Sequence, residues 1–528
     1  MSKDRMPEHL RGKNVHVVGL SGTEGSTVVD FLVGRGATSL VAHDFLSRQV
    51  FPENFRRHHQ WLPEGAQEEA IRRILACPIA YRFGDDYLKD ILTADVIFAT
   101  QAWFRYPQNA PLREAQRAGI PFSSMTHLFF ETCPCPILGV TGTNGKFTTA
   151  VLIEQMLRRA GHPVVFSGND RTHVPMLYRL DEITPRHWLV LEISNRQLIG
   201  LPYSPRLAVV TNVVPHHLDD HGSMEAYAEV KRTIVRHQGP DDLAVLNFDN
   251  PHTRVMGETC RSRVHYFSRT QRVAWGACVE DGQIVIVDGD RREPIVLVAD
   301  LRVPGAHTVE NALAASVAAH LAGAPADAIR GALREFRGLP YRLHLAAEAD
   351  AVRYYEDSLA TNPSAAAAGI RAMDRPVVLI AGGVRRDATP DDFLPMVEAL
   401  AAGRVRGVLL IGATGPVLEA ALRRWPGGNP PPVHRCRTLE AAVDVAQTLV
   451  HPGDAVLLSP GCESFDLFRD YRHRGDRFRE LVEGRARTPG GAEDAGGTEH
   501  SGSAEDPRTA ACGEDSPLTL PSPPAGEG

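Results

Sequence analysis

The sequence predicts an α/β protein with an N-terminal Rossmann-like domain, a central phosphate-loop domain and a C-terminal Rossmann-like domain. An apolar run at 137–140 leads through a Gly-rich turn into a helical pattern, and a second such unit begins at Val15. After residue 375, short apolar runs alternate with Ala-rich helical stretches. This alternation is typical of parallel sheets with crossover helices.

Length and charge limit the class of protein. A chain of 528 residues with 43% hydrophobic and 23% charged residues is too long for one core and is ordinary for a globular protein. Residues 488–528 hold eight Asp/Glu and one Arg, which accounts for the whole net charge of −7. The rest of the chain is neutral, so we expect no nucleic-acid partner.

The chain shows no sign of export. The N-terminal stretch lacks the apolar run of a signal peptide, and no run of about 18 apolar residues occurs. The eight cysteines are scattered except for Cys133 and Cys135, so we expect neither a disulfide framework nor a zinc site. A cytoplasmic protein without a membrane span is the expectation.

Composition and pattern divide the chain into four segments. The three domains are expected at 1–131, 132–338 and 339–485. The remainder, 486–528, is rich in Gly, Pro, Ser and acidic residues and has scarcely any large apolar side chain. Such a segment cannot bury a core, so we expect a disordered acidic tail.

The central turn, Thr141–Lys146, has the features of a phosphate loop. Gly142 and Gly145 allow the backbone to wrap around an anion, the helix start offers N–H groups, and Lys146 adds positive charge. The pattern predicts a nucleoside-triphosphate site; the alternative is a turn that only connects strand to helix. A Ser or Thr that binds Mg²⁺ normally follows the lysine, but here the residue is Phe147.

Two later segments carry candidate metal ligands. Glu192 ends an apolar run, where a carboxylate would suit a metal beside a triphosphate, although a Glu on an exposed strand edge is the alternative. The stretch 215–221 holds three His and two Asp, which indicates metal or phosphate chemistry. Its alternative is a solvated polar loop.

The first Gly-rich turn, 19–25, follows a predicted strand, and Asp44 lies about 25 residues further on. This is the general dinucleotide-binding pattern. The alternative is a tight turn without a ligand.

Together these motifs resemble the Mur ligase family, the ATP-dependent amide-forming enzymes of peptidoglycan precursor synthesis, over about 10–485. The stretches that carry the resemblance are Thr141–Lys146, Leu191–Gln197, His217–Asp219, Asn311–Ala315 and Asp357–Asn362. Their order along the chain is hard to produce by chance. The resemblance implies UDP-sugar binding by the first domain, ATP binding by the second and amino-acid binding by the third.

Within this family the chain is most similar to the branch that adds D-glutamate to UDP-N-acetylmuramoyl-L-alanine. The resemblance implies an acyl-phosphate intermediate, ATP and Mg²⁺ as cofactors, and a monomer. A ligase for a different amino acid, or a ligand-binding pseudoenzyme with a scaffold or regulatory role, is the alternative.

The resemblance also implies roles for individual residues. Catalysis is expected of Lys146, Glu192, His217 and Lys231, and Mg²⁺ binding of Glu192, His217 and a carbamylated Lys231. ATP is expected at Gly142, Thr143, Asn144, Gly145, Lys146, Thr148, Thr149, Asn311, Arg342 and Asp357. Substrate is expected at Gly19, Ser21, Gly22, Thr23, Asp44, Arg386, Ser464 and Tyr471.

Three of these roles have ordinary alternatives. Lys231 shares a helix face with Tyr227 and would otherwise be a solvated charge. Arg386 would otherwise be a surface charge, and Asn311 a capping or packing residue. The chain departs from the family at Phe147, at Leu359 in place of Lys, and at Thr100–Trp103 in place of Ser-Pro-Gly.

Overall fold

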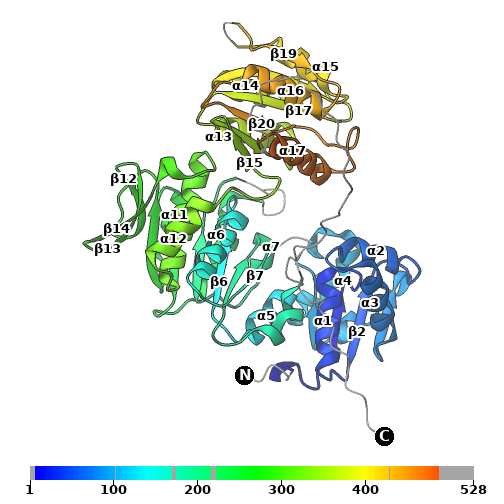
Figure 1. Ribbon diagram of the computed structural model, residues 1–528. Coiled ribbons are helices and arrows are strands. Elements are labelled where there is room, and N and C mark those ends of the chain that lie inside the picture. Colours follow the sequence, from blue (N-terminus) through cyan, green and yellow to red (C-terminus); the bar gives the residue numbers. More distant parts are fainter. Residues whose placement is uncertain (1–5, 102, 169–173, 216–221, 427–428, 487–528) are drawn as a thin grey trace, which may run out of the picture.

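The computed structural model describes residues 6–101, 103–168, 174–215, 222–426 and 429–486. It contains three separate β-sheets flanked by helices, which confirms the predicted α/β class (Figure 1). The acidic tail predicted from 486 lies outside these residues except for Ala486. Over the described residues, no helix is both long enough and apolar enough to cross a membrane.

The first sheet has five parallel strands in the order β3-β2-β1-β4-β5, the Rossmann-like arrangement. Its strands are β1 (Val15–Val18), β2 (Leu40–Asp44), β3 (Ala80–Phe83), β4 (Val96–Phe98) and β5 (Phe122–Ser123). Its helices are α1 (Thr23–Gly34), α2 (Phe51–His58), α3 (Glu64–Ala76), α4 (Ala110–Arg117) and α5 (Met125–Thr132).

The central sheet has nine strands in the order β14-β13-β12-β11-β10-β9-β6-β8-β7. They are β6 (Ile137–Thr141), β7 (Val164–Ser167), β8 (Trp188–Glu192), β9 (Leu207–Val210), β10 (Leu243–Asn247), β11 (Arg263–Ser268), β12 (Trp275–Glu280), β13 (Gln283–Asp288) and β14 (Arg291–Leu297). The strands from β7 to β12 are parallel, and β13 and β14 extend the sheet antiparallel.

The inner strands of this sheet are almost wholly apolar because helices cover both faces. The helical segments are α6 (Lys146–Arg159), the 3₁₀ helix η6 (Met176–Glu182), α7 (Asn195–Leu198), α9 (Met224–Arg236), α10 (Pro251–Glu258), α11 (Ala306–Leu321) and α12 (Ala326–Glu335). Helix α6 packs against α11 and α12, while η6 packs against α1 and α5 of the first unit. The central sheet therefore contacts the N-terminal unit directly.

The third sheet has six strands in the order β15-β16-β20-β17-β18-β19, and only β15 runs antiparallel to its neighbour. Its strands are β15 (His344–Ala349), β16 (Val352–Glu356), β17 (Val377–Gly382), β18 (Val405–Ile411), β19 (Val433–Arg435) and β20 (Ala455–Leu458). Its helices are α13 (Pro363–Ala372), α14 (Leu394–Ala401), α15 (Gly415–Leu422), α16 (Leu439–Leu449) and α17 (Tyr471–Ala486).

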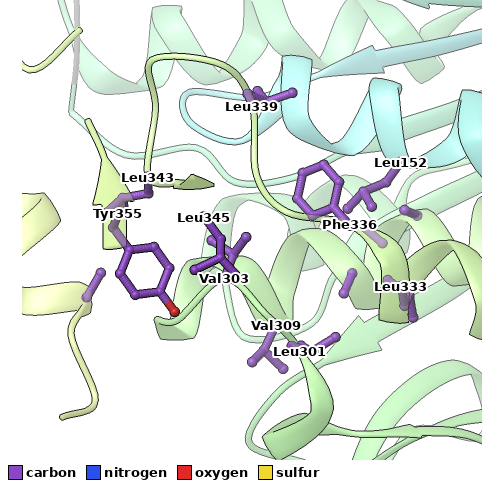
Figure 2. Close-up of a cluster of buried hydrophobic side chains, with 14 of the residues drawn as sticks. Leu152, Leu301, Val303, Val309, Leu333, Phe336, Leu339, Leu343, Leu345 and Tyr355 are labelled. Atoms are coloured by element: carbon purple, nitrogen blue, oxygen red, sulfur yellow. The ribbon is translucent and has the colours of Figure 1, made fainter. Parts of the chain in front are cut away.

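One apolar cluster joins the central and C-terminal units (Figure 2). It contains Leu152 of α6, Val309 of α11 and Leu345 and Tyr355 of the third sheet, all buried. The Tyr355 hydroxyl also donates a hydrogen bond to the Arg302 carbonyl oxygen at 2.8 Å. The linker between the two units is thus packed into a core, and the third sheet is held beside α6 and α11.

Candidate active site

The phosphate loop lies where β6 ends and α6 begins. Gly142 and Gly145 have φ angles of +149° and +82°, which favour glycine. A Cβ on Gly142 would lie 1.9 Å from Thr211 Oγ1, and one on Gly145 would lie 2.1 Å from Asn311 Oδ1. Both glycines are therefore required by backbone conformation and by close neighbours.

Residues at the end of β9 hold this loop in shape. The N–H of Thr143 donates to the Asn212 carbonyl at 2.8 Å, and the N–H of Asn144 donates to Asn212 Oδ1 at 3.0 Å. The Thr211 hydroxyl donates to the Asn144 carbonyl at 2.6 Å. The first N–H groups of a helix such as α6 cannot be paired inside the helix, and a helix start of this kind can bind an anion.

Thr211 and Asn212, which shape the loop, are not among the predicted site residues. Both follow the buried strand β9 directly, at the carboxyl edge of a parallel sheet where ligands bind. That position was the signal available in the sequence.

Lys146 and Glu192 interact electrostatically at the carboxyl edge of the central sheet. Lys146 Nζ donates to the Thr143 carbonyl at 3.1 Å. Burial lowers the pKa of Lys146, the negative charge of Glu192 opposes that shift, and the positive charge of Arg342 adds to it. Glu192 is 9% exposed at the end of β8, so the alternative of an exposed strand edge is wrong.

Lys231 on α9 is only 1% exposed, which excludes the alternative of a solvated helix charge. Its Nζ donates to the Gly142 carbonyl at 2.8 Å and lies 4.9 Å from the centre of the Tyr227 ring. Burial, and then the charge of Lys146, lowers the pKa of Lys231 to about 7. Near neutral pH a large share of this amine is therefore uncharged.

Two further contacts tie the loop to the surrounding helices. The hydroxyls of Tyr227 and Thr143 lie 3.2 Å apart. The Thr149 hydroxyl donates to Asn311 Oδ1 at 3.3 Å, and Asn311 is 5% exposed. The predicted residues of the loop, α9 and α11 thus come together around one Gly-rich turn.

Phe147 uses its ring for packing. The ring lies 5.7 Å from that of Phe166 on β7, at an interplanar angle of 70°, and joins the apolar core beside α6. It supplies no oxygen to a cation, and Thr148 stands next to it, half-buried.

The predicted ligand His217 and its neighbour Asp219 lie outside the described residues. Within the described part of the chain, no group of three or more His, Cys, Asp or Glu side chains is arranged to hold a metal ion. Glu192 is thus the described carboxylate candidate beside the loop.

The N-terminal Gly-rich turn is closed by the chain itself. Asp44 is 1% exposed and accepts hydrogen bonds from the N–H groups of Ser21 at 2.6 Å and Leu46 at 3.0 Å. Gly19 has a φ of +87°, and its carbonyl accepts from the Gly22 N–H at 3.0 Å. The Thr23 hydroxyl donates to the His58 carbonyl at 2.6 Å.

The predicted residues of the third unit lie after its strands and at the start of α17, except Arg342. Asp357 is 5% exposed and accepts from the Ser459 hydroxyl at 2.7 Å and the Leu343 N–H at 3.2 Å, and burial raises its pKa to about 7. Arg342 is exposed in the linker and acts electrostatically on both Asp357 and Lys146.

Three residues predicted to bind the amino acid are spread over this unit. Arg386 is exposed after β17, Ser464 is buried after β20, and Tyr471 begins α17. The Tyr471 ring packs edge-on against Tyr341 at 5.6 Å. Their shared role stays a prediction.

Two family models match the chain. The Mur ligase middle domain matches residues 140–319, and the Mur ligase glutamate ligase domain matches residues 341–462.

Curated relatives cover most of the chain. A UDP-N-acetylmuramoylalanine–D-glutamate ligase of Symbiobacterium thermophilum is 39% identical over 76% of this chain and 86% of its own length. A protein of the same name from a Roseiflexus species is 37% identical over 90% of this chain and 99% of its own. A protein of the same name from Caldanaerobacter subterraneus is 32% identical over 90% of this chain and 98% of its own length.

Solved structures share the fold. A UDP-N-acetylmuramoyl-L-alanyl-D-glutamate–2,6-diaminopimelate ligase is 18% identical with a TM-score of 0.53, covering 86% of this chain and 94% of its own. The UDP-N-acetylmuramate–alanine ligase of Thermotoga maritima is 19% identical with a TM-score of 0.50. The match covers 90% of this chain and 100% of the other.

Proposed function

The chain belongs to the Mur ligase family, and we propose that it joins D-glutamate to UDP-N-acetylmuramoyl-L-alanine at the expense of ATP, in peptidoglycan precursor synthesis. The observation that carries this proposal is the grouping of Lys146, Glu192 and Lys231 around one phosphate loop. The relatives named as D-glutamate ligases specify the substrates.

In the proposed reaction, the alanine carboxylate attacks the γ-phosphorus of ATP, which gives an acyl-phosphate and ADP. The glutamate amine then attacks the acyl carbon, and phosphate leaves from a tetrahedral intermediate. The first step brings two anions together, and unit charges at ~4 Å repel by about 4 kcal/mol at an effective dielectric of 20. Lys146 and the N–H groups that begin α6 would offset this repulsion.

The residues present fit a magnesium ion. Mg²⁺ prefers oxygen ligands and commonly takes one or two carboxylates plus phosphate and water. Glu192 would provide the carboxylate, and Thr148 or water would stand where Phe147 offers no hydroxyl. When bound, the ion would neutralise charge on the transferring phosphoryl group.

Lys231 fits the predicted carbamylation by its chemistry. Only an uncharged amine attacks carbon dioxide, and burial keeps the pKa of this amine at about 7. The product would be an anion in contact with the phosphate loop. Carbamylation would thus convert a buried base into a further oxygen ligand.

Arg342, Asp357, Thr149 and Asn311 would complete the ATP site, while Gly19, Ser21, Gly22, Thr23 and Asp44 would line the uridine diphosphate. Arg386, Ser464 and Tyr471 would hold glutamate. Arg386 suits this role because a guanidinium binds a carboxylate through two hydrogen bonds. Parts of the site come from three units, so closure of the third unit would assemble them.

A phosphate-release assay on the purified protein tests this function. We expect phosphate only when ATP, UDP-N-acetylmuramoyl-L-alanine and an amino acid are all present, with D-glutamate fastest in a panel of amino acids. Fastest release with another amino acid would correct the substrate. Bound ATP without release for any amino acid would contradict the ligase and support the ligand-binding pseudoenzyme.

A further inference from the structure

A cavity lies between the N-terminal unit and the central sheet. It has a volume of about 210 Å³ and is bounded by α1, α5, β7, η6 and β8. Figure 1 shows α1 and α5 beside the end of the central sheet that carries β7 and α7. Apolar side chains, among them Met125, Phe129 and Leu191, form much of its wall.

Glu24 brings an acidic group to this cavity. It lies in the first turn of α1 and lines the cavity together with Thr23. Its Oε2 atom is buried and has no hydrogen-bond partner among the described residues. A buried carboxyl oxygen is costly to leave unpaired, so an orphan of this kind needs a partner that the protein does not supply.

The orientation of Glu24 is set by Gln101, which in turn contacts a residue that lines the cavity. The backbone N–H of Gln101 donates a hydrogen bond to the Glu24 carboxylate. The Gln101 side chain donates in turn to the Thr126 hydroxyl at 3.3 Å, and Thr126 lines the same cavity. Gln101 falls within the stretch 100–103, where the chain departs from the Ser-Pro-Gly of its family.

The first turn of a helix favours acidic residues through the helix dipole, but an exposed carboxylate would serve that purpose equally well. Exposed Glu64 at the start of α3 is such a residue. The helix dipole therefore does not account for burial beside a cavity.

The charge state of Glu24 suits a neutral polar ligand. Burial raises the pKa of Glu24 to about 7, and the Gln101 N–H opposes that shift. In its ionised form this carboxylate accepts a hydrogen bond from an N–H or O–H group, whereas it repels a phosphate. With mostly apolar walls and a few polar groups, the cavity has the composition of a small-molecule subsite.

We propose that Glu24 is a specificity-determining residue that accepts a hydrogen bond from a neutral N–H or O–H donor of the nucleotide-linked substrate in this cavity. The inference rests on the proposed function and deepens it. The donor belongs either to the N-acetylated sugar or to the lactyl-alanine arm beyond it. Glu24 discriminates because a ligand without the donor leaves Oε2 buried and unpaired.

The first experiment compares Michaelis constants by phosphate release for wild type, Glu24→Ala, Glu24→Gln and the matched control Glu64→Gln. We expect Glu24→Ala to raise KM for UDP-N-acetylmuramoyl-L-alanine about tenfold and to leave KM for ATP and glutamate unchanged, since about one hydrogen bond to a charged group is lost. Glu24→Gln keeps an acceptor oxygen and should have a smaller effect in the same direction. Unchanged KM for the nucleotide-linked substrate in both variants overturns the inference.

A second experiment measures binding calorimetrically and does not depend on turnover. UDP-N-acetylmuramoyl-L-alanine and the truncated UDP-N-acetylglucosamine are titrated into wild type and Glu24→Gln, which keeps side-chain size and so protects folding. Weaker binding of both ligands to the variant assigns the donor to the sugar; weaker binding of the longer ligand alone assigns it to the lactyl-alanine arm. Equal affinities, or no binding to wild type, overturn the inference. Wild type that binds but releases no phosphate would count against the proposed reaction while leaving this test valid.

Discussion

The two Gly-rich turns of this molecule share a backbone plan and differ in charge. Each follows a buried parallel strand, has at least one glycine of positive φ, and leads into a helix whose first N–H groups lack helical partners. The N-terminal turn is surrounded by the carboxylates of Asp44 and Glu24. The central turn is surrounded by the cations Lys146 and Arg342 and by the buried amine of Lys231, with Glu192 beside them.

The backbone pattern thus decides where a ligand can approach, and side chains distant in the sequence decide which ligand is favoured. Lys231 lies 89 positions from the Gly142 carbonyl that it contacts. A triphosphate carries several negative charges and suits only the central turn. The N-terminal turn, flanked by the carboxylates of Asp44 and Glu24, suits a nucleotide sugar, whose diphosphate carries fewer charges than a triphosphate.

The largest expected effect comes from removing the charge that most distinguishes the central turn. Lys146→Met should lower the rate of phosphate release by about 10³-fold, because a preorganised cation at the transferring phosphoryl group is lost. The variant should remain folded, since among the described residues Lys146 makes a single hydrogen bond, to the Thr143 carbonyl. Lys89→Met, at an exposed ion pair with Asp86, is the control. Near wild-type turnover in Lys146→Met would contradict the claim that positive charge at the central turn is needed for phosphoryl transfer.

Acid should loosen the N-terminal turn before the central one. His16 Nδ1 and His43 Nε2 lie 2.9 Å apart in β1 and β2, and burial lowers the pKa of His16 to about 4 and of His43 to about 3, from 6.5. The folded state keeps both rings neutral while the unfolded chain takes up protons, so stability is present above pH 6.5 and is lost as pH falls towards 4.

The expected loss is about 3 kcal/mol for each of the two rings, because a pKa unit is worth about 1.4 kcal/mol and the window from pH 6.5 to about 4 spans about 2.5 units. Urea unfolding at several pH values measures it, and hydrogen exchange shows which turn opens first. An exposed histidine replaced by Ala, His434→Ala, should leave the profile unchanged. Equal acid sensitivity of both turns would contradict the role of the His16–His43 pair.

Opening the N-terminal turn is the next test. Asp44→Ala removes the acceptor of two backbone N–H groups, those of Ser21 and Leu46, and should reduce the free energy of unfolding by about 1–3 kcal/mol. KM for UDP-N-acetylmuramoyl-L-alanine should rise while KM for ATP stays constant. Exposed Asp85→Ala is the control. A rise in KM for ATP instead would mean that the two turns do not serve separate ligands.

The smallest effect is expected at the position where the central turn departs from its family. Phe147→Thr supplies a hydroxyl beside Lys146 but gives up the ring contact with Phe166. We expect about 1–2 kcal/mol lower stability, because a half-buried aromatic side chain is lost, and saturation at a lower Mg²⁺ concentration. Phe166→Leu controls for the packing loss alone. An unchanged Mg²⁺ requirement would show that water already fills the ligand position.

The sequence was sufficient for the parts of the fold that repeat a simple pattern. Strands such as β1, β6 and β20 are short apolar runs between turn signals, so the three-part α/β plan and both turns were predictable. The antiparallel strands β13 and β14 that extend the central sheet were not predicted. The Asp281-Gly282 turn with positive φ at both residues was its available signal, because this pair favours a two-residue hairpin.

Site residues that belong to a sequence motif were predictable. The burial of a side chain, which depends on the tertiary structure, was not. Lys146 and Glu192 stand at strand ends, which the pattern marks. The burial of Lys231 depends on contacts with the distant phosphate loop, and the helical pattern of α9 contains no sign of them. In the sequence, Glu24 resembles any acidic residue at the start of a helix. Only the structure places it beside a cavity. His217 lies outside the described residues, so its role stays a prediction.

The central claim, that an acyl-phosphate forms at the Lys146 turn, is tested most directly by oxygen transfer. UDP-N-acetylmuramoyl-L-alanine labelled with ¹⁸O in its carboxylate is turned over with ATP and D-glutamate, and the released phosphate is analysed by mass spectrometry. The account predicts one ¹⁸O atom in each phosphate, because the carboxylate oxygen that attacks phosphorus leaves with it. Phosphate without label, released while the amide product forms, would contradict it.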